Sequence, residues 1–360
     1  MLLSPEGHCC VKKCEMDLSN YVPSSSTSGP PVIWFSQATE SLCARISLQQ
    51  PTDRPAAPCV LSYLNEGGAN FVFRIQPQAC QNSSMQLHGR VPLLRIRKDL
   101  SHVQTAEEQL RSFNQHFKPL FPAQNLVEHE AVQLDDQVIP RLNQTISQAK
   151  RSSSRTGVLM PNNEQYGLLI TNMSPLPMEK LVQFKPKWLA QSPNAPAGSK
   201  RCRTCALRAQ RQAKNQGTAT DAQENCPLAM ISENAHDRRR AAGATTTDKR
   251  LRDYLIDDAQ PLLRTLKENQ QRFDSSGVLG NVDDNALYDI CKAMSLRDCT
   301  LFLKHGQLGV EARLSDLDLK QPEKLDKWRA VEEALINEGW YQNREPEEVW
   351  KEEKVCLLSI

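Results

Sequence analysis

The chain has 360 residues and a mass of 40.6 kDa, which is long enough for one large domain or two ordinary ones. Its 44 basic and 42 acidic residues give a formal net charge of only +2, which excludes a uniformly basic nucleic-acid coat and an acidic solvating tail. Apolar residues make up 39%, and 22 prolines accompany a mean hydropathy of −0.54. We therefore expect part of the length to stay unpacked.

Residues 1–57 are rich in Ser, Pro and Thr and lack hydrophobic periodicity, so we expect a disordered leader without a fold. The start of the chain lacks the apolar core of a signal peptide, and no apolar run approaches the roughly 20 residues that cross a bilayer. The twelve cysteines therefore indicate mostly free thiols in a soluble, reducing intracellular protein. The run Arg238-Arg239-Arg240 fits either partial localisation to the nucleus or a solvated helix face.

From residue 58 the pattern is β-rich, and beyond residue 199 it is mostly helical. Strands are predicted over residues 59–64, 70–76, 91–97, 126–134, 167–171, 181–187, 299–303 and 313–319. Helices are predicted over residues 103–117, 142–150, 201–213, 248–273, 284–296 and 322–338. We expect an α+β protein with a β-rich N-lobe over 58–175 and a mostly helical C-lobe with short strands over 176–360.

A basic stretch of forty residues, 181–220, contains eight bases and no acid. A solvated basic surface is the ordinary interpretation, but such a stretch would repel itself unless an anion binds there. Interleaved aromatic residues are missing, which disfavours single-stranded nucleic acid and favours a small polyphosphorylated ligand. Lys185 and Lys187 are predicted to share one face of a strand, and Arg203 and Arg211 one face of a helix.

Acidic residues mark two further candidate positions. Asp316 and Asp318 fall two apart on a predicted strand, where two adjacent carboxylates favour either Mg²⁺ binding or an ordinary exposed face. Asp298 lies between a helix and an apolar run, a position that either presents a side chain to a cleft or caps a turn. A glycine turn, Gly67-Gly68, lies between two strands and could approach a phosphate or form a plain hairpin.

Zinc is a further alternative, because Cys202 and Cys205 have zinc-knuckle spacing and Cys226 and His236 could complete four ligands. No second CxxC or HxxxH pair follows, which favours free thiols over structural zinc.

Seven sequence blocks, in this order, resemble the inositol-pentakisphosphate 2-kinase family, and particularly its fungal members. They are EGGANFVFRI, LLRIRK, YGLLITNM, QFKPKWLAQSP, RCRTCALRAQR, MSLRDCTLFL and DLDLKQPEKLDKW. The resemblance implies a two-lobed, kinase-related fold that uses MgATP to phosphorylate the 2-hydroxyl of inositol 1,3,4,5,6-pentakisphosphate. The product would be inositol hexakisphosphate (phytate), and we expect a monomer with a small-molecule substrate and no membrane or nucleic-acid partner.

The resemblance also implies roles for single residues. Asp298 would be the general base, Asp316 the Mg²⁺ ligand with Asp318 as a second candidate, and Arg95 a contact to the ATP phosphates. The remaining nucleotide contacts would be Gly67, Gly68, Ala69, Asn70, Thr171, Asn172 and Met173. The substrate phosphates would be held by Lys185, Lys187, Arg203, Arg211, Lys320 and Lys324, with Arg155 and Arg264 as looser matches.

The chain departs from the family pattern at several nucleotide-facing positions. Asn65 replaces a Gly, Asn172 an Asp, and Gln183 a Glu. An inactive kinase-like scaffold and a non-catalytic polyphosphate- or RNA-binding protein are therefore the alternatives to an active kinase. Asp298 and Asp316 favour the kinase, because a simple anion binder has no need of acids facing its ligand.

Overall fold

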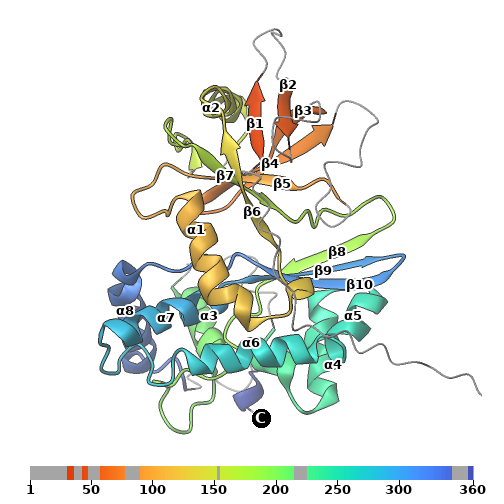
Figure 1. Ribbon diagram of the computed structural model, residues 1–360. Helices are drawn as coiled ribbons and strands as arrows, with labels where there is room; N and C mark the ends of the chain where they lie inside the picture. The colour runs from red at the N-terminus through yellow and green to blue at the C-terminus, as the bar shows by residue number, and fades with distance from the viewer. Residues whose placement is uncertain are drawn as a thin grey trace, which may run out of the picture.

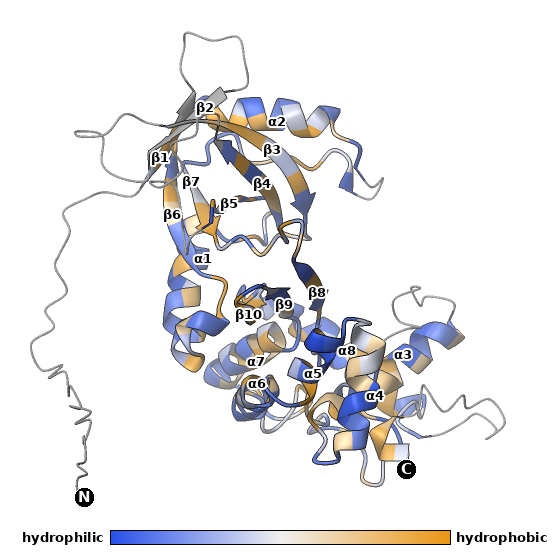
Figure 2. Ribbon diagram, turned by 90° about the vertical axis from the view of Figure 1, so that its right-hand side faces the viewer, coloured by the Kyte–Doolittle hydropathy of each residue, from blue (hydrophilic) through white to orange (hydrophobic). Residues whose placement is uncertain are grey.

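The computed structural model describes residues 31–35, 43–47, 57–77, 90–151, 155–214, 225–342 and 356–359. A closed β-barrel forms the upper part of the molecule, and helices around a three-stranded sheet form the lower part (Figure 1). Figure 2 shows the same two parts from the side, one above the other. The expected α+β fold with two lobes is confirmed. Within the described residues, each helix is too short or too polar to cross a membrane.

The barrel has the strand order β1-β2-β3-β4-β5-β7-β6 and closes through a parallel pairing of β1 with β6. Phe71, Phe73 and Ile75 of one strand point into the barrel core, and the residues between them face away from it, as expected for a strand with one buried face. The barrel strands are β1 (Val32–Phe35), β2 (Cys43–Ser47), β3 (Ala57–Glu66), β4 (Asn70–Pro77), β5 (Leu93–Arg97), β6 (His129–Leu134) and β7 (Tyr166–Ile170). Helix α2 (Val138–Gln148) adds its apolar face to this core.

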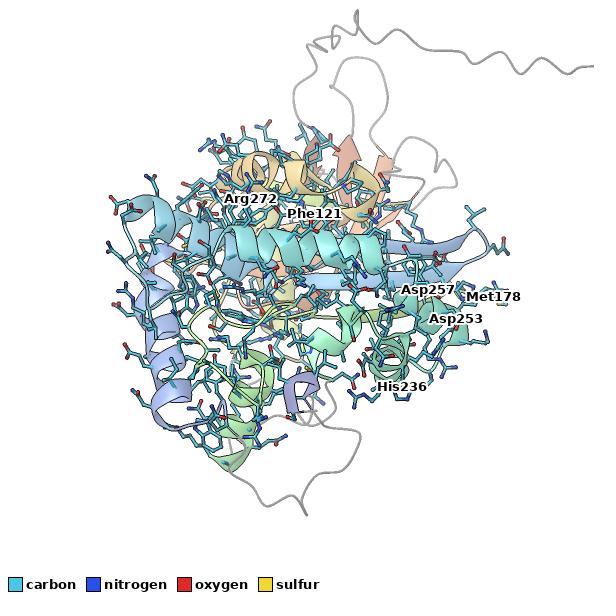
Figure 3. The ribbon with its side chains drawn as sticks, turned by 90° about the horizontal axis from the view of Figure 1, so that it is seen from below. Phe121, Met178, His236, Asp253, Asp257 and Arg272 are labelled. Atoms are coloured by element: carbon cyan, nitrogen blue, oxygen red, sulfur yellow. The ribbon has the colours of Figure 1, made fainter. Side chains whose placement is uncertain are left out.

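The lower part is built on the antiparallel sheet β10-β9-β8, against which α5 and α6 pack (Figure 1). Its strands are β8 (Lys180–Phe184), β9 (Thr300–Gly306) and β10 (Gly309–Ser315). Its helices are α3 (Arg203–Ala213), α4 (Ala235–Thr245), α5 (Lys249–Ile256), α6 (Gln260–Arg272), α7 (Asp284–Leu296) and α8 (Leu325–Asn337). Helix α1 (Ala106–Ser112) and the turn after it contribute Phe113 and Phe117 to this lower core. Seen from below, α6 crosses the molecule towards Arg272 (Figure 3).

Two helix predictions needed correction. The single helix predicted over residues 248–273 is two helices. The first helix ends at Ile256, and the second begins at Gln260 with Pro261 in its first turn, where a backbone N–H would have no partner within the helix and its loss costs no hydrogen bond. Helix α4 was not predicted as an element, and it carries the arginine run. There Arg238 donates hydrogen bonds to the backbone carbonyls of Ser232 (2.7 Å) and Ile256 (2.9 Å).

The prediction that residues 1–57 have no fold is wrong for two short segments. Val32–Phe35 and Cys43–Ser47 are strands that pair with one another, and they join β6 and β3 in the barrel. Both segments are short runs with β-branched or aromatic residues, and the Ser- and Pro-rich composition around them hid that signal. The other residues of 1–57, apart from Pro31 and Ala57, lie outside the described residues.

A buried ion cluster anchors the turn between β3 and β4. The Glu66 carboxylate lies 2.5 Å from Lys98 Nζ and accepts two hydrogen bonds from Arg151, at 2.8 and 3.0 Å. Only 3% of the Glu66 side chain is exposed, and both cations also lie over the Phe71 ring. Burial opposes ionisation, but Arg151 and Lys98 outweigh it and lower the pKa of Glu66 to about 2. The cluster therefore fixes the end of β3 to β5 and to the segment after α2.

Replacing Glu66 by Gln should lower the free energy of unfolding by about 3 kcal/mol at neutral pH, because two buried cations lose their counter-charge. Since the folded pKa lies below the ordinary value of 4.5, this stabilisation is complete above pH 4.5 and is lost as the pH falls towards 2. Urea unfolding of both proteins at several pH values measures the difference.

Glu233→Gln is the matched control, because that carboxylate is 83% exposed beside Arg264. It should leave stability unchanged. A Glu66→Gln defect of the same size at pH 3 and pH 7 would show that packing, and not ionisation, is responsible.

Candidate active site

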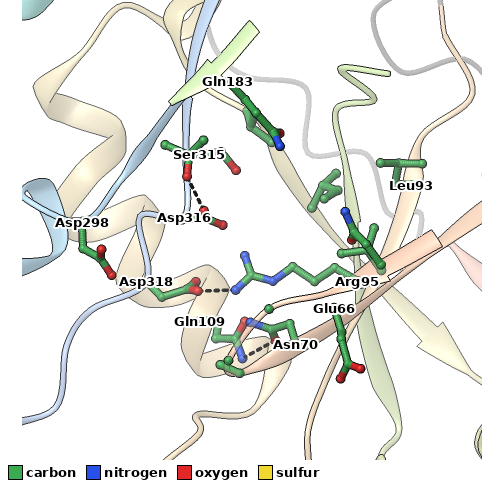
Figure 4. Close-up of a pocket in the computed structure, with 18 of the residues that line it drawn as sticks. Glu66, Asn70, Leu93, Arg95, Gln109, Gln183, Asp298, Ser315, Asp316 and Asp318 are labelled. Carbon is green, nitrogen blue, oxygen red and sulfur yellow. Dashed lines mark hydrogen bonds and ion pairs between the residues drawn. The ribbon is translucent and has the colours of Figure 1, made fainter. Parts of the chain in front are cut away.

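A cavity of about 960 Å³ lies between the barrel and the lower part of the molecule (Figure 4). Residues from both parts line it, including the glycine turn, β5, the segment after β7, and the loop after β10. Most of the residues singled out from the sequence line this cavity. They are Gly67, Gly68, Ala69, Asn70, Arg95, Arg155, Thr171, Met173, Lys185, Asp298, Asp316, Asp318, Lys320 and Lys324.

The glycine turn forms one wall of the cavity. It is closed by a hydrogen bond from the Gly67 N–H to the Asn70 carbonyl (2.9 Å), and the Ala69 carbonyl accepts from the Lys98 N–H (2.8 Å). A Cβ atom placed on Gly67 or Gly68 would meet no protein atom within 4 Å. The missing side chains therefore leave space on the cavity side, where backbone N–H groups can approach a ligand phosphate.

Arg95 links the two parts across the cavity. It lies on β5, between core residues of that strand, and its guanidinium forms an ion pair with Asp318 of the lower part (Figure 4). A second guanidinium nitrogen lies 3.4 Å from Nε2 of His129, a ring whose pKa is lowered to about 3 by burial and by Arg95. Burial opposes ionisation of Asp318, but Arg95 outweighs it and keeps the pKa of that carboxyl below its ordinary value.

The prediction that Asp316 and Asp318 share one strand face is wrong. Strand β10 ends at Ser315, and Asp316 has a left-handed backbone (φ +58°), which ends the extended conformation. The exposed Asp316 carboxylate accepts a hydrogen bond from Thr300 Oγ1 at 2.6 Å. Both carboxylates nevertheless line the cavity, because the loop after β10 passes along it.

Three lysines converge on the Asp298 carboxylate. Their Nζ atoms lie 3.0 Å (Lys185), 3.5 Å (Lys187) and 2.9 Å (Lys320) from its oxygens. Burial opposes ionisation, but Lys320 and then Lys185 outweigh it and hold the pKa of Asp298 well below its usual range. The lysines come from two segments more than 100 residues apart in the sequence. A carboxylate surrounded in this way stays ionised at neutral pH, and it neutralises part of the basic site.

The two lysines of the KPK sequence do not reach this place by strand alternation, as the sequence had suggested. Strand β8 ends at Phe184, and Lys187 has a left-handed backbone with φ +61°. The loop turns Lys187 towards Asp298 from outside the sheet. The predicted shared strand face is therefore wrong: both lysines contact Asp298 from the loop after β8, and Lys185, but not Lys187, is among the residues that line the cavity.

The other wall of the cavity is formed by the segment after β7. Thr171 and Met173 line it, and Thr171 is held by hydrogen bonds to the backbone of Glu128. The Asn172 side chain makes hydrogen bonds to the backbone: it donates to the Val91 carbonyl at 3.1 Å and accepts from the Ser174 N–H at 2.9 Å. Gln183 also lines the cavity.

Two further bases lie at the cavity. Arg155 donates to the Glu66 carbonyl at 2.6 Å, and Lys324 lies on the short turn before α8. Burial and then the neighbouring Lys320 lower the pKa of Lys324. Both residues line the cavity, Arg155 beside the glycine turn and Lys324 near Lys320.

Three of the predicted phosphate-binding arginines lie elsewhere. Arg203 is buried, with its Nε 2.8 Å from Glu332 and its guanidinium carbon 4.3 Å from the centre of the Trp188 ring. Arg211 lies near the exposed end of α3, and Arg264 pairs with Glu233 on the surface at 3.1 Å. The basic stretch is also not unopposed, because Asp298, Glu332 and Glu338 supply counter-charges from distant parts of the sequence.

Four cysteines form a cluster away from the cavity. The Sγ atoms of Cys202, Cys205, Cys226 and Cys356 all lie within 4.8 Å of one another. The spacing pointed to Cys202 and Cys205, and of the two residues offered to complete the set Cys226 belongs to the cluster, whereas Cys356 takes the place expected for His236. His236 projects from α4 at the surface (Figure 3). No local pattern points to Cys356, because more than 120 residues separate it from the other three.

Comparison with known proteins agrees with this geometry. The sequence profile of the family described as inositol-pentakisphosphate 2-kinase matches residues 63–286 and 247–334. The inositol-pentakisphosphate 2-kinase of Yarrowia lipolytica (strain CLIB 122 / E 150) is 30% identical over 202 residues, which span 50% of this chain and 66% of that protein. The two profile matches together cover well over half of the chain, from within β3 to within α8. The chain therefore belongs to the inositol-pentakisphosphate 2-kinase family.

Proposed function

We propose that the protein is a kinase that transfers the γ-phosphoryl group of ATP to the 2-hydroxyl of inositol 1,3,4,5,6-pentakisphosphate, giving inositol hexakisphosphate. One observation carries the proposal: an ionised Asp298 lies among three lysines, in the same cavity as Asp316 and Asp318. A pentakisphosphate needs many cations and phosphoryl transfer needs carboxylates, and this cavity holds both. Family membership and the name of the Yarrowia relative support the same reaction.

ATP would lie against the barrel wall of the cavity. The glycine turn offers backbone N–H groups to its phosphates, and Arg95 offers a guanidinium on the same side. Thr171 and Met173 would face the adenine. The donor set of Asp316 and Asp318 fits Mg²⁺, which prefers carboxylate oxygens and would offset the charge of the phosphates when bound.

The inositol phosphate would lie on the lysine side of the cavity. Its phosphates would compete with Asp298 for Lys185, Lys187 and Lys320, because a dense polyanion attracts an ammonium more strongly than one carboxylate does. As the lysines move to the phosphates, the pKa of Asp298 rises towards the range useful for a general base. Asp298 would then accept the proton of the attacking hydroxyl, while the lysines hold the hydroxyl in line with the γ-phosphate.

We also propose that the cysteine cluster holds a structural zinc ion. Tetrahedral coordination with Zn–S bonds of about 2.3 Å requires sulfurs about 3.8 Å apart. The sulfur of Cys226 lies 3.8 Å from that of Cys202 and 3.7 Å from that of Cys356. Three of the four cysteines are buried, Cys205 is partly exposed, and the ligands are thiols alone, which suits a closed structural site and not a catalytic one.

Incubating the protein with MgATP and inositol 1,3,4,5,6-pentakisphosphate should yield inositol hexakisphosphate, detected by anion-exchange chromatography. Asp298→Asn should lower kcat by at least about 100-fold, because the base is lost, and should not weaken substrate binding, because the lysines lose a competing carboxylate. Wild-type protein that binds the pentakisphosphate without phosphorylating it would exclude the kinase and support the non-catalytic anion binder.

Lys187→Ala should weaken binding of the pentakisphosphate in low salt, and the difference from wild type should shrink as salt increases, because the lost contact is ionic. Calorimetric titration at several salt concentrations measures it. Lys249→Ala is the control, since Lys249 is 80% exposed on α5 and pairs with Asp253. A Lys187→Ala defect that is the same at all salt concentrations would contradict an ionic role.

The purified protein should contain about one zinc ion per chain by mass spectrometry of the metal, given four thiolate ligands. Cys226→Ser should lose the ion and unfold at a lower temperature. Cys291→Ser, which replaces a buried cysteine outside the cluster, should keep it. Equal metal content in the two variants would show that the cluster binds no zinc.

A further inference from the structure

Gln270 is a buried side chain behind the lysine side of the cavity. It lies on α6, is 1% exposed, and makes three hydrogen bonds to the backbone of two other segments. Its Nε2 donates to the carbonyls of Lys187 (2.9 Å) and Leu296 (3.2 Å), and its Oε1 accepts from the Leu189 N–H (2.9 Å). Both amide protons are used, so one side chain fixes two loops to one helix.

The first loop carries Lys187. A left-handed backbone at a lysine costs about 1 kcal/mol and persists only where its surroundings hold it. Gln270 bonds the carbonyl of Lys187 and the N–H of Leu189, the groups on either side of Trp188, much as a neighbouring strand would. The direction of the Lys187 side chain therefore depends on the side-chain amide of Gln270.

The second loop carries Asp298. Leu296 is the last residue of α7, where backbone carbonyls lose their partners within the helix. Gln270 supplies a donor to the Leu296 carbonyl, two residues before Asp298. One Gln270 nitrogen thus bonds the backbone carbonyls of Lys187 and Leu296, and the Lys187 ammonium lies 3.5 Å from the carboxylate of Asp298, two residues after Leu296.

Burial alone does not distinguish Gln270 from an ordinary core glutamine, and α6 offers the comparison. Gln260 on the same helix is 8% exposed and also donates to two backbone carbonyls, those of Met230 (3.0 Å) and Leu255 (2.9 Å). Met230 and Leu255 are not next to a charged residue of the cavity, whereas Leu296 lies two residues before Asp298 and Lys187 itself pairs with Asp298. The two glutamines make the same kind of hydrogen bond, but only Gln270 bonds the backbone at Lys187 and near Asp298.

We propose that Gln270 is a positioning residue for phosphoryl transfer, which sets Lys187 and Asp298 relative to each other through their backbones. The proposal rests on the proposed function of this cavity. A residue in this role should matter for the inositol phosphate and for the chemical step, and should not matter for ATP, whose proposed wall is on the barrel.

Gln270→Met keeps the length of the side chain and removes all three hydrogen bonds. Relative to Gln260→Met, it should lower kcat on the order of 10- to 100-fold, because displacing reacting groups by about 1 Å can cost 100-fold. The KM for the pentakisphosphate should rise, and the KM for ATP should stay within about twofold of wild type. Both variants should lower the melting temperature similarly. Equal kcat in the two variants would overturn the proposal.

A double-mutant cycle measured by binding separates this inference from the proposed function. Calorimetric titration with the pentakisphosphate alone reports on Lys187 whether or not the protein transfers a phosphoryl group. In wild-type background Gln270→Met should weaken binding, and in a Lys187→Ala background it should add less than about twofold. Gln270→Glu, which keeps the acceptor for Leu189 and loses the donors, should show the same coupling if Gln270→Met fails to fold.

Additive effects of Gln270→Met and Lys187→Ala would overturn the positioning role even in an active enzyme. Conversely, a wild-type protein that binds the pentakisphosphate and shows this coupling, but makes no hexakisphosphate, would reject the kinase and keep the link between Gln270 and Lys187.

Discussion

The electrostatic attraction between the Asp298 carboxylate and the lysines around it is the constraint on which the site depends. A pocket that must hold a pentakisphosphate needs several cations close together, and these cations repel one another before the ligand arrives. Asp298 reduces this repulsion from within the site, with Lys185 and Lys320 within 3.0 Å. The same carboxylate is the proposed base, so one group both neutralises the site without substrate and acts on the substrate when it binds.

Arg95 and Asp318 repeat this arrangement on the nucleotide side. The guanidinium belongs to the barrel and the carboxylate to the lower part, so their ion pair joins the two lobes across the cavity. Each is proposed to have a different partner when ATP and Mg²⁺ are bound. Acidic and basic side chains are therefore paired with one another on both the nucleotide side and the lysine side of the cavity. The +2 net charge of the chain does not reveal this pairing.

The sequence predicted most of the elements and most of the candidate residues that line the cavity, because alternation in strands such as Leu93–Arg97 and ordered family blocks are local signals. It failed where position depends on contacts distant in sequence. The burial of Arg203 against Glu332 is such a case, since an arginine on a basic helix gives no sign of a partner 129 residues away. Cys356 and Gln270 are others. The loop conformation of Asp316 was missed because its neighbours alternate as in a strand.

Lys187 and Asp316 are the two non-glycine residues with positive φ among the described residues, and both carry charged side chains proposed to act in the reaction. Glycine would relieve the backbone at either position, but it would remove the ammonium or the carboxylate. The conformation most favourable for stability and the side chain needed for chemistry therefore exclude each other at these two positions. In a selection for stability alone, substitutions of Lys187 and Asp316 should therefore be among the first to appear.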